Sequence, residues 1–221
     1  MTRLDIKKGF TVPELLVVLA ISGLIATISI SGLVNFSRQN RLADTAYEVA
    51  SVIREVQSYA YFVKAGGVGN SFDTGYGIQF GTDAGGDANG GKSFVSFGDL
   101  FLSGQRKGDY VCNSGNALAT CSAVANAEGE FIRKYTLAKG VYLESMCVTG
   151  ATERCYSFLT NTGDLARLSI VFLRPNPASA SIHADGYGPN TFGTRATVRF
   201  RTPDGAARNL IISASGQIYV E

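Results

Sequence analysis

The sequence of 221 residues predicts an α+β protein, with one long N-terminal helix followed by an antiparallel β-sheet domain. Two observations carry this prediction. From Phe10 to about Lys64 the sequence has helical patterning, and the only proline in this range, Pro13, stands near its start. After Gly66-Gly67, which we expect to stop the helix, short β-branched and aromatic runs alternate with glycine-rich turns.

The second half of the predicted helix, residues 35–65, is amphipathic. Its apolar side chains recur at alternating spacings of four and three and so line one face, which we expect to pack on the sheet. A coiled-coil stalk is the alternative, but only about three heptads are present. The apolar positions are Leu42, Ala46, Val49, Ile53, Val56, Ala60 and Val63.

Residues 66–221 form the predicted β-rich, extracytoplasmic domain. Its clearest turn is Thr202-Pro203-Asp204-Gly205, because proline presets φ, aspartate bonds locally and glycine accepts the next conformation. The predicted strands are Tyr76–Phe80, Ser93–Phe97, Phe131–Leu137, Val141–Val148, Tyr156–Thr160, Leu168–Arg174, Ser179–His183, Arg195–Arg201, Ala207–Ser213 and Gln217–Val220.

The first half of the helix, residues 10–34, follows two lysines and a glycine and is mostly apolar. A helix of about 20 apolar residues can span the hydrocarbon core of a bilayer, and we expect this half to do so. A cleaved secretory signal does not fit, because the apolar run is too long and no small-residue cleavage site follows it. Glu14 is the exception, since a carboxylate in such a helix costs on the order of 2–3 kcal/mol and is expected to have a partner.

The run Lys8-Gly9-Phe10-Thr11-Val12-Pro13-Glu14-Leu15-Leu16 resembles the prepilin signal of type IV pilins and type II secretion pseudopilins. The resemblance implies a type IV pilin-like fold and removal of a leader, residues 1–9, by a cut between Gly9 and Phe10 on the cytoplasmic side. Phe10 would then be N-methylated, and Glu14 would be the fifth mature residue. In a bundle of like helices Glu14 can offset the amine of Phe10 in a neighbouring subunit, which would set the axial register.

The same resemblance points to a weak place in the helix. Gly23 is the fourteenth mature residue, where pilins often carry glycine, and Ser31 followed by Gly32 stands where many carry proline. Glycine and hydroxyl residues lower helix propensity, so we expect weakening near Gly23, Ser31 and Gly32. Pro13 replaces the usual aliphatic residue, but it is tolerated in the first four residues of a helix.

The C-terminal run from Leu210 to Val220 predicts two strands about a Ser-Gly turn. Within it, Ser213-Ala214-Ser215-Gly216-Gln217-Ile218 resembles the ending of H-type pseudopilins and FimT-like minor pilins. The resemblances therefore cover the two ends of the chain, and Gly81–Gly129 carries no motif.

Charge separates the leader from the rest of the chain. The net charge of +2 comes from 20 basic and 18 acidic side chains. The leader holds three basic residues and one acidic, which leaves 20 − 3 = 17 basic and 18 − 1 = 17 acidic residues. The positive leader suits the cytoplasmic side of a membrane. The neutral remainder gives no general attraction to nucleic acid, so a nucleic-acid partner is conceivable but unsupported.

The four cysteines occur as two local pairs whose spacings do not fit a zinc knuckle. In a chain directed to the membrane, two local disulfides are the favoured interpretation, Cys112–Cys121 and Cys147–Cys155. Pairing across the two pairs stays open, as do reduced cysteines packed in a core.

No catalytic residue, cofactor or metal site is predicted. Asp83–Gly91 resembles a calcium loop only loosely, because the carboxylates of its first and last places are missing. His183 is the only histidine, no nucleophile elbow accompanies it, and we expect a structural or surface role near an exposed loop. A group of arginines near one hairpin would suit DNA phosphates, although a solvated strand face is the better interpretation. These are Arg195, Arg199, Arg201 and Arg208, of which the three odd-numbered arginines would share one strand face.

The expected function is structural: a pilin or minor pilin of a type IV pilus, and not an enzyme. The chain would be inserted once in the cytoplasmic membrane and processed by the prepilin peptidase and N-methyltransferase. The inner-membrane assembly platform would then move it from lipid into a helical filament of homologous subunits, as an extracellular pilus or a periplasmic pseudopilus.

Three alternatives keep parts of this expectation. The first is a pseudopilin of a type II secretion system, and the second is a minor pilin that captures DNA or a surface. The third is a membrane-anchored binding protein or enzyme that never polymerises.

Overall fold

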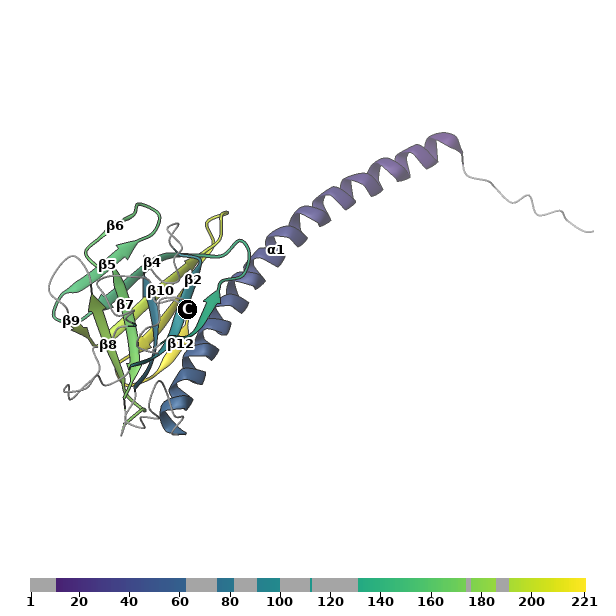
Figure 1. Ribbon diagram of the computed structural model, residues 1–221. Coiled ribbons are helices and arrows are strands. Elements are labelled where there is room, and N and C mark those ends of the chain that lie inside the picture. Colours follow the sequence, from purple (N-terminus) through teal and green to yellow (C-terminus); the bar gives the residue numbers. More distant parts are fainter. Residues whose placement is uncertain are drawn as a thin grey trace, which may run out of the picture. The chain divides into compact units, whose positions relative to one another are not determined.

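The computed structural model describes residues 11–62, 75–81, 91–99, 112, 131–173, 176–185 and 191–221, with backbone alone at 29–35, 185 and 191. The chain divides into two compact units, residues 1–40 and 41–221. One helix and twelve strands are described (Figure 1), and the strands form antiparallel sheets against which the helix packs. The expected α+β class is confirmed.

Helix α1 runs from Val12 to Tyr61. It ends before the expected Lys64, and the predicted glycine stop and Val63 lie outside the described residues. Ala60 is the last buried side chain of α1, and Phe62, in the turn that follows, is 82% exposed.

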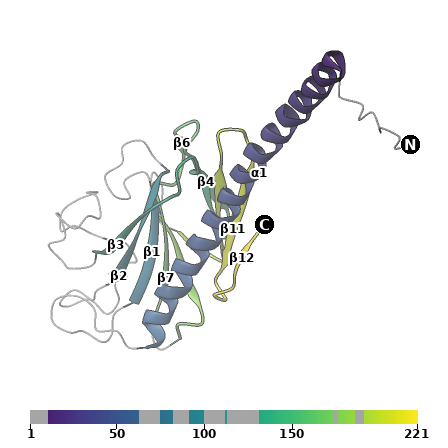
Figure 2. The same ribbon diagram turned by 90° about the vertical axis from the view of Figure 1, so that its right-hand side faces the viewer.

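The apolar stripe of the second half of α1 is confirmed within residues 41–61. Its members Leu42, Ala46, Val49, Ile53, Val56 and Ala60 are all buried. Figures 1 and 2 show this part of α1 alongside the sheets.

The strands form two six-stranded sheets, where a single sheet was expected. The first sheet has the order β3-β2-β1-β7-β8-β9 and the second the order β12-β11-β10-β4-β5-β6. The first comprises β1 Gly75–Gly81, β2 Ser93–Asp99, β3 Phe131–Thr136, β7 Arg167–Phe172, β8 Ala180–Asp185 and β9 Thr191–Gly193. The second comprises β4 Tyr142–Thr149, β5 Glu153–Ser157, β6 Thr162–Gly163, β10 Arg195–Arg201, β11 Ala207–Ser213 and β12 Ile218–Val220.

Most strand predictions are confirmed within one or two residues, and two strands were missed. The missed strands, β6 and β9, have two and three residues, too few for an alternating pattern. Strand β5 begins three residues before the predicted Tyr156 and ends at Ser157. The predicted Thr202–Gly205 turn is present, with the Gly205 N–H donating to the Thr202 carbonyl at 3.0 Å.

One hydrophobic core joins the helix to both sheets. Its members include Ile53 of α1, Ile170 of the first sheet and Val198 of the second, all fully buried. A smaller cluster forms on the other face of the first sheet around Phe97, Val171 and Cys112. The Cys112 N–H donates to Gln79 Oε1 at 3.0 Å, which fixes this cysteine beside β1.

Candidate assembly site on the N-terminal helix

Helix α1 starts close to the predicted processing bond. Thr11 lies outside the helix, and its carbonyl accepts a hydrogen bond from the Leu15 N–H at 3.2 Å. Pro13 is the second helical residue, where no intrahelical N–H bond is needed. Glu14 is the third, so Thr11 and Glu14 have the spacing of a capping box, and the acid suits the positive end of the helix dipole.

The residues predicted for processing, Gly9 and Phe10, lie outside the described residues. Their roles therefore stay predictions. The Glu14 side chain is exposed, and it makes no hydrogen bond or ion pair with the described part of the chain. Its pairing with an amine of another subunit also stays a prediction.

The first half of α1 presents apolar side chains in every direction. From Val12 to Ile28 each large apolar side chain is more than half exposed, with values from 52% to 75%. A helix that is hydrophobic all round requires an apolar environment, such as lipid or other helices. The side chains concerned are Val12, Leu15, Leu16, Val17, Val18, Leu19, Ile21, Leu24, Ile25 and Ile28.

Among the described side chains, no helical segment is both long and apolar enough to cross a membrane. The membrane-spanning role of residues 10–34 stays a prediction.

Helix α1 is continuous through Gly23, Ser31 and Gly32. The Thr27 hydroxyl donates to the Gly23 carbonyl at 2.9 Å, a back-bond that slightly destabilises helices. A Cβ at Gly23 would meet no atom within 4 Å, so packing inside this chain does not require glycine there. The expected weakening of the helix at these residues stays a prediction.

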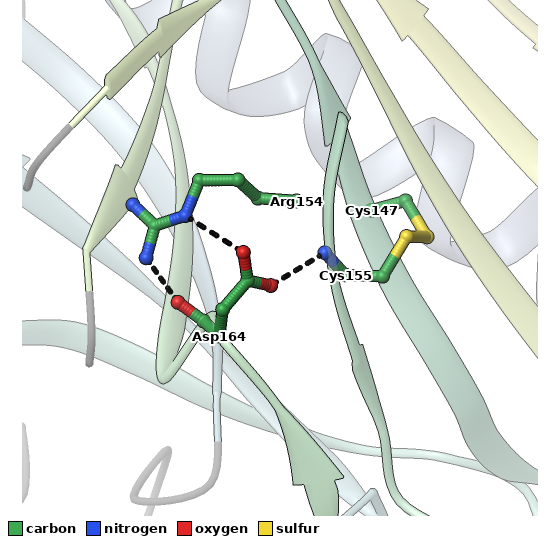
Figure 3. Close-up of a disulfide and its surroundings, with 4 residues drawn as sticks. All are labelled: Cys147, Arg154, Cys155 and Asp164. Atoms are coloured by element: carbon green, nitrogen blue, oxygen red, sulfur yellow. Dashed lines mark hydrogen bonds and ion pairs between the residues drawn. A yellow bond between two sulfur atoms is a disulfide. The ribbon is translucent and has the colours of Figure 1, made fainter. Parts of the chain in front are cut away.

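The expected disulfide Cys147–Cys155 is present, between directly paired residues of β4 and β5. Cys112 is also disulfide-bonded, and its predicted partner Cys121 lies outside the described residues. Figure 3 shows Asp164 in contact with Arg154 and with the backbone of Cys155 in β5, next to the Cys147–Cys155 disulfide. One Asp164 carboxylate oxygen accepts from the Cys155 N–H at 3.1 Å, and the other lies 3.3 Å from Arg154 Nε.

The arginine face on β10 is real, but it is largely paired. Arg195 and Arg199 are exposed and alternate with buried apolar residues, so the predicted odd-numbered face is confirmed. Arg199 Nε and Arg201 Nη1 lie 3.0 and 3.3 Å from the two carboxylate oxygens of Glu144. Arg208 pairs with core-facing Phe200 and so belongs to the opposite side.

Glu144 reaches these arginines because β4 contains a bulge. Arg199 pairs with Ser145 and the next residue, Phe200, pairs with Leu143, which leaves Glu144 as the extra residue. The burial of Leu143 and Met146 agrees with the bulge, since both face the core although they are three residues apart in one strand. Strict alternation would have placed them on opposite faces.

The C-terminal Ser-Gly turn packs closely on the segment that leads into β8. Gly216 has φ of +77°, and a Cβ there would lie 2.0 Å from the Ala178 carbonyl oxygen. The Ala180 N–H donates to the Ala214 carbonyl at 2.9 Å, and Gln57 of α1 donates to the Pro177 carbonyl at 3.1 Å. Glycine is therefore required by close packing at this turn, which gives the motif a structural explanation.

Within the described residues, the remaining candidate sites form no metal or catalytic site. Asp83 to Gly90 of the loose calcium pattern lie outside them. One grouping of Cys147, Glu153 and Cys155 has metal-like proximity, but its two sulfurs are bonded to each other. His183 is 5% exposed in β8 with its ring 5.2 Å from that of Phe192, which agrees with the structural one of the two expected roles. The loop expected at residues 186–188 lies outside the described residues.

A family model for the prokaryotic N-terminal methylation motif matches residues 5–30. No curated protein and no solved structure matches the chain. The matched segment contains Gly9, Phe10 and Glu14, together with most of the exposed apolar helix. The chain therefore carries a prokaryotic N-terminal methylation motif, the signal of type IV pilins and pseudopilins.

Proposed function

We propose that this protein is a structural subunit, a pilin or minor pilin, of a type IV pilus. Processing cuts between Gly9 and Phe10, Phe10 is methylated, and the first half of α1 joins the subunit to its neighbours. The observation that carries the proposal is the helix from Val12 to Ile28, whose large apolar side chains are all exposed within the matched motif.

Two apolar environments suit this half of the helix in turn. Lipid of the cytoplasmic membrane covers it before assembly, and the same halves of other subunits cover it in the filament. Because both environments are apolar, the transfer changes hydrophobic burial little, and close packing and polar contacts select the position of the subunit. Glu14 is exposed near the start of the helix and provides the charged contact, with the amine of a neighbouring Phe10 as its partner.

A pseudopilin of a type II secretion system is the second candidate, because the Ser213–Ile218 turn resembles that branch. It uses the same processing and the same helix. Capture of DNA has less support, since Arg199 and Arg201 already share Glu144 as a partner.

Substitution of two glycines tests the proposal. Gly9→Val in the full-length chain, expressed with a prepilin peptidase, is expected to retain the leader and enter no filament. Gly23→Val is the control for cleavage, because a side chain at Gly23 meets open space. Removal of the leader from both variants at the wild-type rate would refute the proposal.

The two filament roles are distinguished by deletion of the gene. Loss of twitching with normal protein secretion supports the pilus, and the reverse supports the secretion pseudopilus. A selective loss of DNA uptake would identify a DNA-capturing minor pilin.

A further inference from the structure

The hairpin of β4 and β5 gathers three metal-ligating side chains on one face of the second sheet. Cys147 pairs directly with Cys155, and Glu153 lies two residues before Cys155, so the three side chains share a face. One ligand atom from each, two sulfurs and a carboxylate oxygen, lies within 4.8 Å of the others. The cysteines are half-buried and the glutamate is exposed, so an ion can reach the group from solvent.

The backbone fixes the two cysteines opposite each other. In the turn between the strands, the Gly150 N–H donates to the Thr152 carbonyl at 3.2 Å. Because bonded and non-bonded pairs alternate along an antiparallel ladder, Cys147 and Cys155 form a non-bonded pair, the kind in which side chains are closest. The Cys155 N–H is therefore free of β4, and it donates to Asp164 Oδ1 at 3.1 Å.

The oxidation state decides what these sulfurs can do. In the disulfide they are bonded to each other and hold no metal. Reduction by a dithiol transfers two electrons and two protons, so the S–S bond breaks, two thiols form and the reductant becomes a disulfide. We propose that the reduced hairpin binds a thiophilic divalent cation of the Zn²⁺ class through Cys147, Cys155 and Glu153, and that disulfide and metal are alternative states. Binding displaces one proton from each thiol.

The donor set and the spacing suit zinc. Zinc binds thiolate sulfur at about 2.3 Å and carboxylate oxygen at about 2.0–2.2 Å, so two sulfurs on one tetrahedral ion are about 3.8 Å apart. The Cα atoms of Cys147 and Cys155 are 4.1 Å apart. Both sulfurs can therefore reach one ion without a change in strand register. Three protein ligands leave the fourth position open to water.

Glu153 is available as the third ligand. Its carboxylate makes no hydrogen bond or ion pair with the described part of the chain. The residues that pair with Glu153 and with Cys147 across the sheet are neutral threonines, Thr149 and Thr197. Two thiolates favour zinc over calcium or magnesium, which prefer oxygen ligands. A bound ion would cross-link the two strands in place of the disulfide and protect the thiols from oxidation.

The first test is metal titration of the full-length chain in detergent micelles, after reduction and anaerobic removal of the reductant. Co²⁺ is the first probe, because thiolate ligands give it charge-transfer absorption, and Zn²⁺ then displaces it. Reduced wild type is expected to bind one ion that reduced Cys147→Ser does not bind, and oxidised wild type should lack this ion as well. Binding that remains in Cys147→Ser is assigned to Cys112 and Cys121, the other two cysteines.

Glu153→Gln tests the third ligand in a chain that keeps both cysteines of the hairpin. Its dissociation constant for Zn²⁺ is expected to rise at least about 10-fold, the lower end of what loss of an outer-shell partner costs a metal site. Glu48→Gln, an exposed glutamate on α1, is the matched control and should keep the wild-type constant. Circular dichroism checks the fold of each reduced chain.

Oxidation gives a second readout. Saturating Zn²⁺ is expected to slow formation of the Cys147–Cys155 disulfide by oxidised glutathione about 10-fold or more, and a chelator should restore the rate. Equal binding by reduced wild type and Cys147→Ser would overturn the inference, as would an unchanged constant in Glu153→Gln or an oxidation rate insensitive to Zn²⁺. A reduced wild type that is unfolded with Zn²⁺ bound would also overturn it, since the site requires paired strands.

Discussion

The two halves of α1 have similar numbers of apolar residues but different surroundings. In the first, every large apolar side chain from Val12 to Ile28 is more than half exposed. In the second, from Arg41 to Tyr61, one apolar stripe is buried and charged residues such as Asp44 and Arg54 are exposed. The second half is stabilised inside its own unit, whereas the large apolar side chains described in the first half are exposed.

This difference agrees with the proposal that one helix serves two purposes. A stripe specifies a single partner surface, and here that surface is the core of the domain. An all-round apolar surface has no preferred direction, so polar features must supply the orientation. In the first half, the proposed function gives this role to Glu14.

The largest expected effect comes from removal of the charge in the first half. Glu14→Ala is expected to reduce incorporation into filaments about 100-fold or more, because loss of one partner of a buried ion pair costs about 3–5 kcal/mol. Leader removal and the stability of residues 41–221 should stay unchanged. Glu48→Ala, an exposed glutamate in the second half, is the matched control. Equal incorporation of both variants, scored in sheared filament preparations, would rule out the assembly role.

A matched pair of isoleucines tests the comparison directly. Ile53 is fully buried and Ile21 is 52% exposed. Ile53→Ala is expected to lower the free energy of unfolding of the domain by about 2–5 kcal/mol, through lost burial and a residual cavity. Ile21→Ala should change it by less than about 0.5 kcal/mol. Urea denaturation followed by circular dichroism provides the measurement, and similar losses would mean that the first half also packs on the domain.

Loss of the Cys147–Cys155 disulfide should affect the β-sheet domain and not the first half of α1. The disulfide closes a short segment with a sequence separation of 8, for which loop-closure entropy predicts about 2–3 kcal/mol of stabilisation. The double change Cys147→Ser with Cys155→Ser should destabilise residues 41–221 by that amount and leave leader removal unchanged. Urea denaturation and a cleavage assay on the same sample check both halves of this expectation. A slower cleavage would show that the halves are coupled.

The smallest expected effect is a dependence on alkaline pH in the second half. A hydrogen bond to Glu55, with burial next, raises the pKa of Tyr59 from 10.0 to about 12. A raised pKa means that this contribution to stability is complete below about pH 10 and is lost as the pH rises toward 12. Tyr59→Phe should flatten the stability profile between those values, as measured by urea denaturation. An unchanged profile would exclude the contact as its source.

Patterns local in the sequence were predictable, and partnerships between distant segments were not. The helical stripe and most strands follow from spacing, and Cys147–Cys155 was the favoured pairing of two cysteines close in the sequence. Alternation identifies a strand but not its neighbour, so the division into two sheets could not be read. Glu144 lies 55 residues before Arg199, and a bulge in β4 directs its side chain, so its contact with the arginines was also unpredictable.

The candidate site was accessible to sequence reasoning for a related reason. Its signals lie within a few consecutive residues, from Gly9 to Glu14, and the matched motif spans the same segment. The place of Thr11 and Pro13 relative to the first helical turn required the structure, because helix ends are set by hydrogen bonds that periodicity does not locate.

The central claim is that this chain is processed after Gly9 to free the first half of α1 for assembly. Its most direct test is the intact mass of the protein purified from cells with a prepilin peptidase. We predict a chain that begins with N-methylated Phe10 and lacks one hydrogen for each of its four cysteines. A chain that keeps residues 1–9, or that begins elsewhere, would contradict the claim.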